Sequence, residues 1–288
     1  MTRQYNYTTP DAHVFTGAMR EAIFKDEFID SPLSTAILGK GTYLDLREAV
    51  HVLIAGTTGS GKSVLLHNII TSLLIRNTPN TAEFLLIDPK IIEFEYFYKD
   101  SPLLFCPVVT DPEEALKQLQ RATEEMMNRY EVLRSSGKRF WTGKKLYIVI
   151  DEIADLVSAG GKSLENIIEK IARLGRGAGV HLIVATQHPT GKVLSRQITT
   201  NLDTRICLKV KDGYASRLVL GTNGGERLRG KGHAILCLNG DFTYFQSAYI
   251  SDEELEAFCR SWEVEEIPEE KPIKIINLKT TISKILSA

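Results

Sequence analysis

A glycine-rich segment, Gly56–Ser63, constrains the fold of this chain more than any other feature. It fits the pattern G-x-x-x-x-G-K-[ST] at every position, follows the apolar run Val52–Ala55 and precedes a second apolar run that begins at Val64. Between a strand and a helix, such a loop turns its amides and the helix N-terminus toward the phosphates of a nucleotide. A chance glycine-rich turn would lack these flanking elements. The sequence therefore predicts a phosphate-binding P-loop.

Each part of this loop has an expected role. Lys62 would reach the β- and γ-phosphates of ATP, and the Ser63 hydroxyl would ligate Mg²⁺. Backbone amides would supply the other phosphate contacts. The predicted nucleotide-binding residues are Gly56, Thr57, Thr58, Gly59, Ser60, Gly61, Lys62, Ser63 and Val64. The histidines show no metal-binding spacing, so ATP with Mg²⁺ is the only cofactor that the sequence implies.

Beyond Val50, short β-rich runs alternate with amphipathic helical runs, which is typical of a parallel sheet covered by helices. The predicted strands are His51–Ala55, Glu83–Ile87, Val108–Thr110, Leu146–Ile150, His181–Ala185, Thr204–Lys209 and His233–Leu238. The predicted helices are Lys62–Arg76, Pro112–Ser135, Ser163–Arg176, Tyr214–Leu220 and Asp252–Trp262, and Gly17–Phe28 also has helical spacing. We predict an α/β P-loop NTPase with a mostly parallel sheet between helices.

Two polar strand ends extend the predicted site. Leu146–Ile150 ends in Asp151 and Glu152, and ligands bind at the C-terminal ends of strands in open α/β sheets. Asp151 would hold Mg²⁺, and Glu152 would polarise the attacking water. If the later strand that ends before Gln187 lies beside this one, Gln187 points at the γ-phosphate and can report its loss. The alternative is a turn residue with a local hydrogen bond.

Composition narrows the functional classes. With 35 basic and 36 acidic residues the net charge is -1, so contact with nucleic acid has to come from local basic loops. Two such loops are Lys138–Lys145 and Lys209–Arg217, although a solvated charged loop is the default interpretation of the first. Scattered cysteines and the absence of a signal peptide or an apolar membrane-length run favour a cytoplasmic location.

Five segments resemble the FtsK/SpoIIIE family of double-stranded DNA translocases, in the family's order. They are Ala55–Leu74, Leu85–Phe97, Tyr147–Val157, Ile168–Thr190 and Asn201–Leu220. Thr57-Thr58 in the P-loop and the signature positions Asp88 and Lys90 are more specific than a general P-loop, although Asp88 and Lys90 receive no catalytic role here. The resemblance covers about residues 38–262. It implies a RecA-like core, a hexameric ring of identical chains and ATP-driven movement along duplex DNA.

The resemblance also places Arg176 at the family's arginine-finger position. There it would stabilise γ-phosphate charge in a neighbouring subunit. The alternative is an arginine that interacts with the C-terminal end of its own helix, which Gly177 would terminate. Arg173 and Arg205 are the substitutes if Arg176 is not the finger.

The domain prediction divides the chain into a lead-in at residues 1–47, a motor at 48–262, and an acidic linker with a tail at 263–288. Family members generally carry further domains, so we expect a motor core that relies on separate membrane or DNA-processing partners. One alternative function keeps this core but moves another polymer, as in conjugative coupling proteins or type VII secretion ATPases. A nucleotide-binding scaffold is a third, and the complete set Lys62, Asp151 and Glu152 argues against it.

Overall fold

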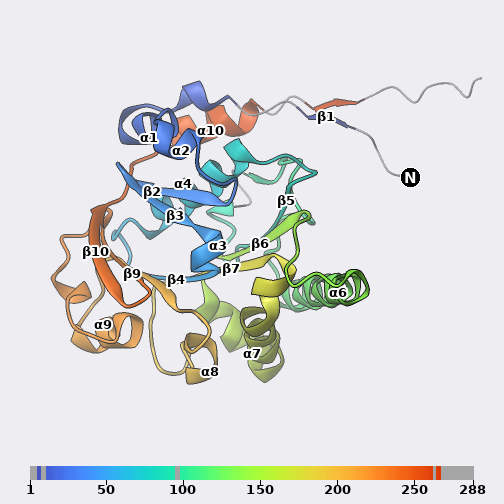
Figure 1. Ribbon diagram of the computed structural model, residues 1–288. Coiled ribbons are helices and arrows are strands. Elements are labelled where there is room, and N and C mark those ends of the chain that lie inside the picture. Colours follow the sequence, from blue (N-terminus) through green and yellow to red (C-terminus); the bar gives the residue numbers. More distant parts are fainter. Residues whose placement is uncertain (1–4, 8–10, 95–97, 262–263, 267–288) are drawn as a thin grey trace, which may run out of the picture.

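The computed structural model describes residues 5–7, 11–94, 98–261 and 264–266. A seven-stranded sheet with the order β10-β9-β8-β4-β7-β6-β5 forms its centre (Figure 1). The neighbours from β8 to β5 are parallel, and β9 and β10 are antiparallel. These strands are β4 (His51–Ala55), β5 (Ala82–Ile87), β6 (Lys145–Ile150), β7 (Val180–Thr186), β8 (Thr204–Cys207), β9 (His233–Leu238) and β10 (Asp241–Gln246). The predicted α/β class with a mostly parallel sheet is confirmed.

Helices cover both faces of the sheet because alternate residues of each central strand point to opposite sides. In β4, Val52 and Ile54 belong to one hydrophobic cluster with α4 (Lys62–Arg76). Leu53 and Ala55 belong to a second cluster with α6 (Pro112–Ser136) and α7 (Ile153–Ala178). The first face also carries α10 (Asp252–Arg260), and the second carries α8 (Arg196–Thr199), α9 (Gly213–Leu220) and the adjacent 3₁₀ turn η2 (Gly225–Arg227).

The lead-in packs on the α4 face (Figure 1). Its elements are η1 (Ala12–Val14), α1 (Gly17–Ile23), α2 (Asp26–Ile29), the hairpin of β2 (Thr35–Gly39) and β3 (Thr42–Asp45), and α3 (Leu46–Ala49). Phe15 and Met19 share the hydrophobic cluster of Leu65 in α4, and Ile37 N donates to Ser72 Oγ of α4 at 3.0 Å. Helix α3 crosses residue 47, and the three-part domain division stays a prediction.

The predicted strand Val108–Thr110 is wrong. Only Val109 bridges to β5, with Val109 N donating to Leu86 O at 3.0 Å and Asp88 N donating to Val109 O at 2.8 Å. The segment cannot extend into a ladder because Asp111 immediately caps α6, accepting hydrogen bonds from two amides of its first turn.

Several element bounds also differ from the prediction. Helix α7 consists of two helical segments joined at a kink at Gly161 (φ 56°, ψ -147°); the predicted helix Ser163–Arg176 corresponds to the second segment, and the first segment, which begins at Ile153, was not predicted. Strand β8 ends at Cys207, and the helical pattern of Gly17–Phe28 divides into α1 and α2. The β2–β3 hairpin and β10 were not predicted.

Towards the C-terminus, α10 ends at Arg260, and its predicted last residue Trp262 lies outside the described residues. Residues 95–97 of the segment Leu85–Phe97 and most of the predicted tail also lie outside the described residues, although β11 (Val264–Glu266) pairs antiparallel with β1 (Tyr5–Tyr7). None of the helices in the described ranges combines the length and apolar character that crossing a bilayer requires.

Candidate active site

The P-loop connects the end of β4 to the start of α4. Gly59 and Gly61 have φ values of 74° and 99°, a conformation that side-chain-bearing residues rarely adopt. A Cβ at Gly61 would lie 2.5 Å from Gly232 N, so this position also has no room for one. Within the described part of the chain, six amides here donate no hydrogen bond: those of Thr58, Gly59, Gly61, Lys62, Ser63 and Val64. Unpaired donors at a helix N-terminus are suited to binding an anion.

Two later segments brace the loop from outside. Lys209 O, just after β8, accepts hydrogen bonds from Thr57 N at 2.9 Å and from Thr57 Oγ1 at 3.0 Å. Gly232 N, just before β9, donates to Ser60 O at 2.7 Å. The sequence analysis missed both contacts, because they join residues more than 150 positions apart and no local pattern marks them.

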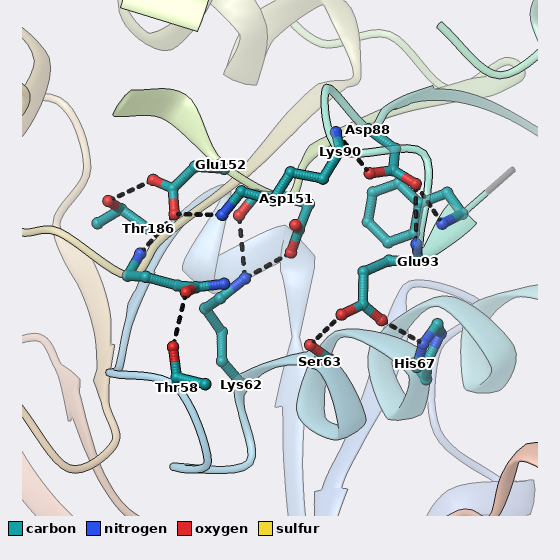
Figure 2. Close-up of polar contacts among 12 residues, drawn as sticks. Thr58, Lys62, Ser63, His67, Asp88, Lys90, Glu93, Asp151, Glu152 and Thr186 are labelled. Atoms are coloured by element: carbon teal, nitrogen blue, oxygen red, sulfur yellow. Dashed lines mark hydrogen bonds and ion pairs between the residues drawn. The ribbon is translucent and has the colours of Figure 1, made fainter. Parts of the chain in front are cut away.

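Lys62 and Asp151 form a buried ion pair (Figure 2). Lys62 Nζ lies 2.5 Å from Asp151 Oδ1 and donates to Asp151 O at 3.1 Å. Burial raises the pKa of the Asp151 carboxyl above its ordinary value, and the neighbouring Lys62 ammonium offsets part of that rise. The loop lysine and the β6 carboxylate thus lie in direct contact at the C-terminal ends of β4 and β6.

Glu152 is completely buried and has several donors around it (Figure 2). Its Oε1 accepts hydrogen bonds from Thr186 Oγ1 at 2.7 Å and, as the N-cap of α7, from Ala154 N at 3.2 Å. Its Oε2 accepts one from Gln187 N at 2.8 Å and lies 3.8 Å from Lys90 Nζ. The carboxylate is therefore fixed in orientation, and the sequence had given no role to Thr186 or Lys90.

Gln187 meets the condition set by the sequence, because β7 lies directly beside β6 in parallel register. The Gln187 Oε1 atom accepts a hydrogen bond from Thr58 Oγ1 at 3.1 Å, which places this amide against the P-loop. The structure thus brings together five predicted residues: Lys62, Ser63, Asp151, Glu152 and Gln187. Their catalytic roles stay predictions.

The sequence analysis missed the contact between Glu93 and the start of α4. Ser63 Oγ donates to Glu93 Oε1 at 2.5 Å, and His67 Nε2 lies 3.3 Å from Glu93 Oε2 (Figure 2). Burial opposes ionisation of Glu93, but hydrogen bonds from His67 and Ser63 outweigh it and hold the pKa below its ordinary value. Mg²⁺ prefers oxygen ligands. The Ser63 hydroxyl and the Asp151 carboxylate are of this type, and the Glu93 carboxylate contacts Ser63, so these residues fit a Mg²⁺ site.

Arg176 lies far from this group of residues. It is exposed in the last turn of α7, just before β7 (Val180–Thr186) begins, whereas the site lies at the C-terminal ends of β4, β6 and β7, at the opposite edge of the sheet. Neither Arg176 nor Arg173 makes a side-chain hydrogen bond or ion pair with any described residue. Arg205, in contrast, donates to the backbone oxygens of Leu202, Val219 and Thr199, so its guanidinium is engaged within its own chain.

The two basic loops differ in which of their lysine and arginine side chains already contact other residues of the chain. Lys144 pairs with Glu83, and Lys145 Nζ donates to Trp141 O at 2.8 Å. The Arg129 guanidinium carbon lies over the Trp141 ring, 5.2 Å from the ring centroid. Lys144 and Lys145 therefore already have partners within the chain, whereas the exposed Lys138 and Arg139 make no ion pair in the described structure. In the second loop, Arg217 bonds to Asn223 at 2.6 Å, and Lys209 and Lys211 are exposed.

Comparison with known families shows to which family of P-loop proteins this chain belongs. A profile described as the FtsK/SpoIIIE family matches residues 29–143 and 139–191, together more than half of the 288 residues. The chain belongs to the FtsK/SpoIIIE family. Its relative "DNA translocase FtsK" from Staphylococcus aureus (strain Mu50 / ATCC 700699) is 38% identical over an alignment of 245 residues, and the match covers 78% of this chain and 31% of the relative. The chain spans about a third of the length of the curated relatives it matches.

Solved structures of other ATPases share this FtsK/SpoIIIE fold. The pCW3 conjugation coupling protein TcpA, in a monomer form with ATPγS, aligns with a TM-score of 0.70 at 28% identity, over 80% of this chain and 70% of TcpA. The cytoplasmic domain of the type VII secretion ATPase EccC from Thermomonospora curvata aligns with a TM-score of 0.64 at 28% identity, over 79% of this chain and 30% of EccC. The predicted family and P-loop ATPase fold are confirmed.

Proposed function

We propose that this chain binds and hydrolyses ATP. The observation that carries the proposal is the meeting of Lys62, Asp151 and Glu152 at one edge of the sheet with six P-loop amides that have no partner in the described structure. The amides bind the phosphate oxygens, and Lys62 exchanges its contact with Asp151 for the β- and γ-phosphates. Glu152, oriented by Thr186 and Gln187, accepts the proton of the attacking water. Gln187 senses the γ-phosphate in this proposal, which its hydrogen bond with Thr58 of the P-loop supports.

Ser63 and Asp151 are the residues that would hold Mg²⁺. When bound, this ion neutralises charge on the transferring phosphoryl group. Lys62 is the only ammonium that contacts Asp151 among the described residues. Its transfer to the phosphates leaves the Asp151 carboxylate free to accept hydrogen bonds from ordered water or to act as a ligand.

The proposed work of this hydrolysis is movement along double-stranded DNA in the cytoplasm, where both ATP and DNA are present. Family membership and the name of the Staphylococcus aureus relative support DNA as the partner. Lys138, Arg139 and Lys211 are exposed and have no ion partner among the described residues, and they supply sequence-independent phosphate contacts. Because the net charge is only -1, DNA contact depends on these local basic loops, and a ring would bring several copies of them to one duplex.

A ring of identical chains, hexameric as the family resemblance implies, gives Arg176 a target. The guanidinium is exposed, has no side-chain partner among the described residues, and lies just before the start of β7, at the opposite edge of the sheet from its own Glu152. It therefore acts on a γ-phosphate only across an interface. Arg205 is a poor substitute because three backbone oxygens already accept its hydrogen bonds, whereas Arg173 remains available.

A second candidate function is transport of another polymer, since TcpA is a conjugation coupling protein and EccC a type VII secretion ATPase. The test is ATP turnover with equal masses of linear duplex DNA, single-stranded DNA and an unfolded polypeptide. Duplex DNA should give the largest stimulation. Preferential stimulation by polypeptide or single strands would favour the second candidate, and no turnover with any polymer would favour a nucleotide-binding scaffold.

A further inference from the structure

The loop after β5 is organised around one buried carboxylate. Asp88 has no exposed surface, and its two oxygens accept hydrogen bonds from four amides of the following residues. Asp88 Oδ2 binds the amides of Glu93 and Phe94, each at 2.9 Å, and Oδ1 binds those of Lys90 and Ile91 at 3.3 and 3.1 Å. Residues 88–94 are thus folded into a compact turn with a fixed backbone.

This turn delivers the Glu93 carboxylate to the start of α4. Glu93 Oε1 accepts the hydroxyl proton of Ser63 at 2.5 Å, and Oε2 lies 3.3 Å from His67 Nε2 (Figure 2). Ser63 and His67 are four residues apart on α4 and therefore share one face. His67 Nδ1 in turn lies 3.0 Å from the buried Tyr98 hydroxyl. Glu93 is held from both sides, and its side chain is only 23% exposed.

We propose that Glu93 is a positioning residue for magnesium: by accepting the Ser63 proton it directs the hydroxyl lone pairs toward the ion. This inference rests on the proposed function, because Ser63 is a ligand only if Mg²⁺ and ATP bind here. A serine hydroxyl has one proton and two lone pairs, so the bond to Glu93 leaves its acceptor side available to the metal. The Glu93 charge also adds to that of Asp151 on the site's acidic side. Partners of this kind are typically worth about 10- to 100-fold in metal affinity.

The experiment measures the Mg²⁺ dependence of nucleotide binding by the full chain, with a fluorescent, non-hydrolysable ATP analogue and Mg²⁺ titrated from EDTA upward. Glu93→Gln keeps the size of the side chain and an acceptor but removes the charge, and Glu93→Ala removes both. Both should raise the Mg²⁺ concentration for half-maximal binding, by about 10-fold for Gln and about 100-fold for Ala. Binding of the analogue in EDTA should stay within about twofold of the unaltered chain.

Glu83→Gln is the matched control. Glu83 lies near the start of β5, the strand that precedes the Asp88 turn; it is 27% exposed and pairs with Lys144. Its removal should leave the Mg²⁺ midpoint unchanged. Equal loss of analogue binding with and without Mg²⁺ in Glu93→Gln would overturn the inference, since that is the mark of a purely structural role. So would an unchanged midpoint. If the unaltered chain itself showed no Mg²⁺-dependent binding, the proposed function would fail together with this inference.

Discussion

Replacement of Lys62 by alanine is expected to damage two separable properties, nucleotide binding and stability. Lys62 has only 4% of its surface exposed, and its ammonium is the ion partner of Asp151, which is 1% exposed. Lys62→Ala removes the phosphate-binding charge and also leaves the Asp151 carboxylate buried without its counter-ion. Breaking a buried pair in this way costs about 3–5 kcal/mol, a large share of the roughly 5–15 kcal/mol that stabilises a typical domain.

A second substitution separates the two effects. Asp151→Asn in the Lys62→Ala background removes the stranded charge, so most of the lost unfolding free energy should return while nucleotide binding stays absent. Urea unfolding and titration of a fluorescent ATP analogue measure the two properties on the same samples. If Lys62→Ala unfolded at the same urea concentration as the unaltered chain, the buried pair would not be a stabilising feature. Undiminished analogue binding would refute the P-loop assignment.

Three further predictions concern hydrolysis, assembly and DNA. Glu152→Gln should bind ATP but turn it over very slowly, because the attacking water loses its proton acceptor; normal turnover in this variant and none in Asp155→Asn would show that the acidic residue is misassigned. Arg176→Ala should bind ATP normally, keep its stability and lose about 10³-fold in turnover, or about 4 kcal/mol of transition-state stabilisation. Mixing this variant with Lys62→Ala should restore part of the ATPase activity. Mixed rings without activity would contradict action across an interface. Duplex DNA affinity should fall linearly with salt concentration on logarithmic axes and be nearly independent of sequence, which a many-fold preference for one sequence would disprove.

The parts of the site that could be predicted are those whose residues are neighbours in the sequence. The P-loop lies within eight residues, Gly56–Ser63, between an apolar strand and a helix, so its conformation follows from local rules. The acidic pair after Leu146–Ile150 is equally local. Gln187 needed one further assumption, the adjacency of β6 and β7, which the parallel register satisfies.

The missed features depend on contacts between distant segments. Glu93 meets Ser63 across 30 positions, and only the turn around Asp88 makes that contact predictable. The sequence had marked Asp88 and Lys90 as signature positions, which was the available signal. The bracing of the P-loop by Gly232, and the engagement of Arg205 by backbone oxygens, have no comparable local pattern.

The errors in secondary structure have local physical causes. The helical segment that begins at Ile153 was missed, whereas the predicted helix from Ser163 matches the segment that follows the kink, where Gly161 takes a positive φ. Val108–Thr110 is β-rich in composition, yet it has a backbone partner only at Val109. Strand β10 alternates poorly because most of its side chains are exposed at the edge of the sheet, so hydrophobic periodicity could not reveal it.

ATP-driven movement along duplex DNA is tested most directly by displacement of a third strand. A labelled oligonucleotide is bound as a triplex near one end of a linear duplex, and its release is followed after addition of protein, Mg²⁺ and ATP. We expect release that requires hydrolysable ATP, slows as the duplex between the triplex and the free end is lengthened, and is absent with Glu152→Gln. ATP hydrolysis stimulated by duplex DNA with no release of the third strand would contradict translocation, and would leave the chain a DNA-dependent ATPase that does not move.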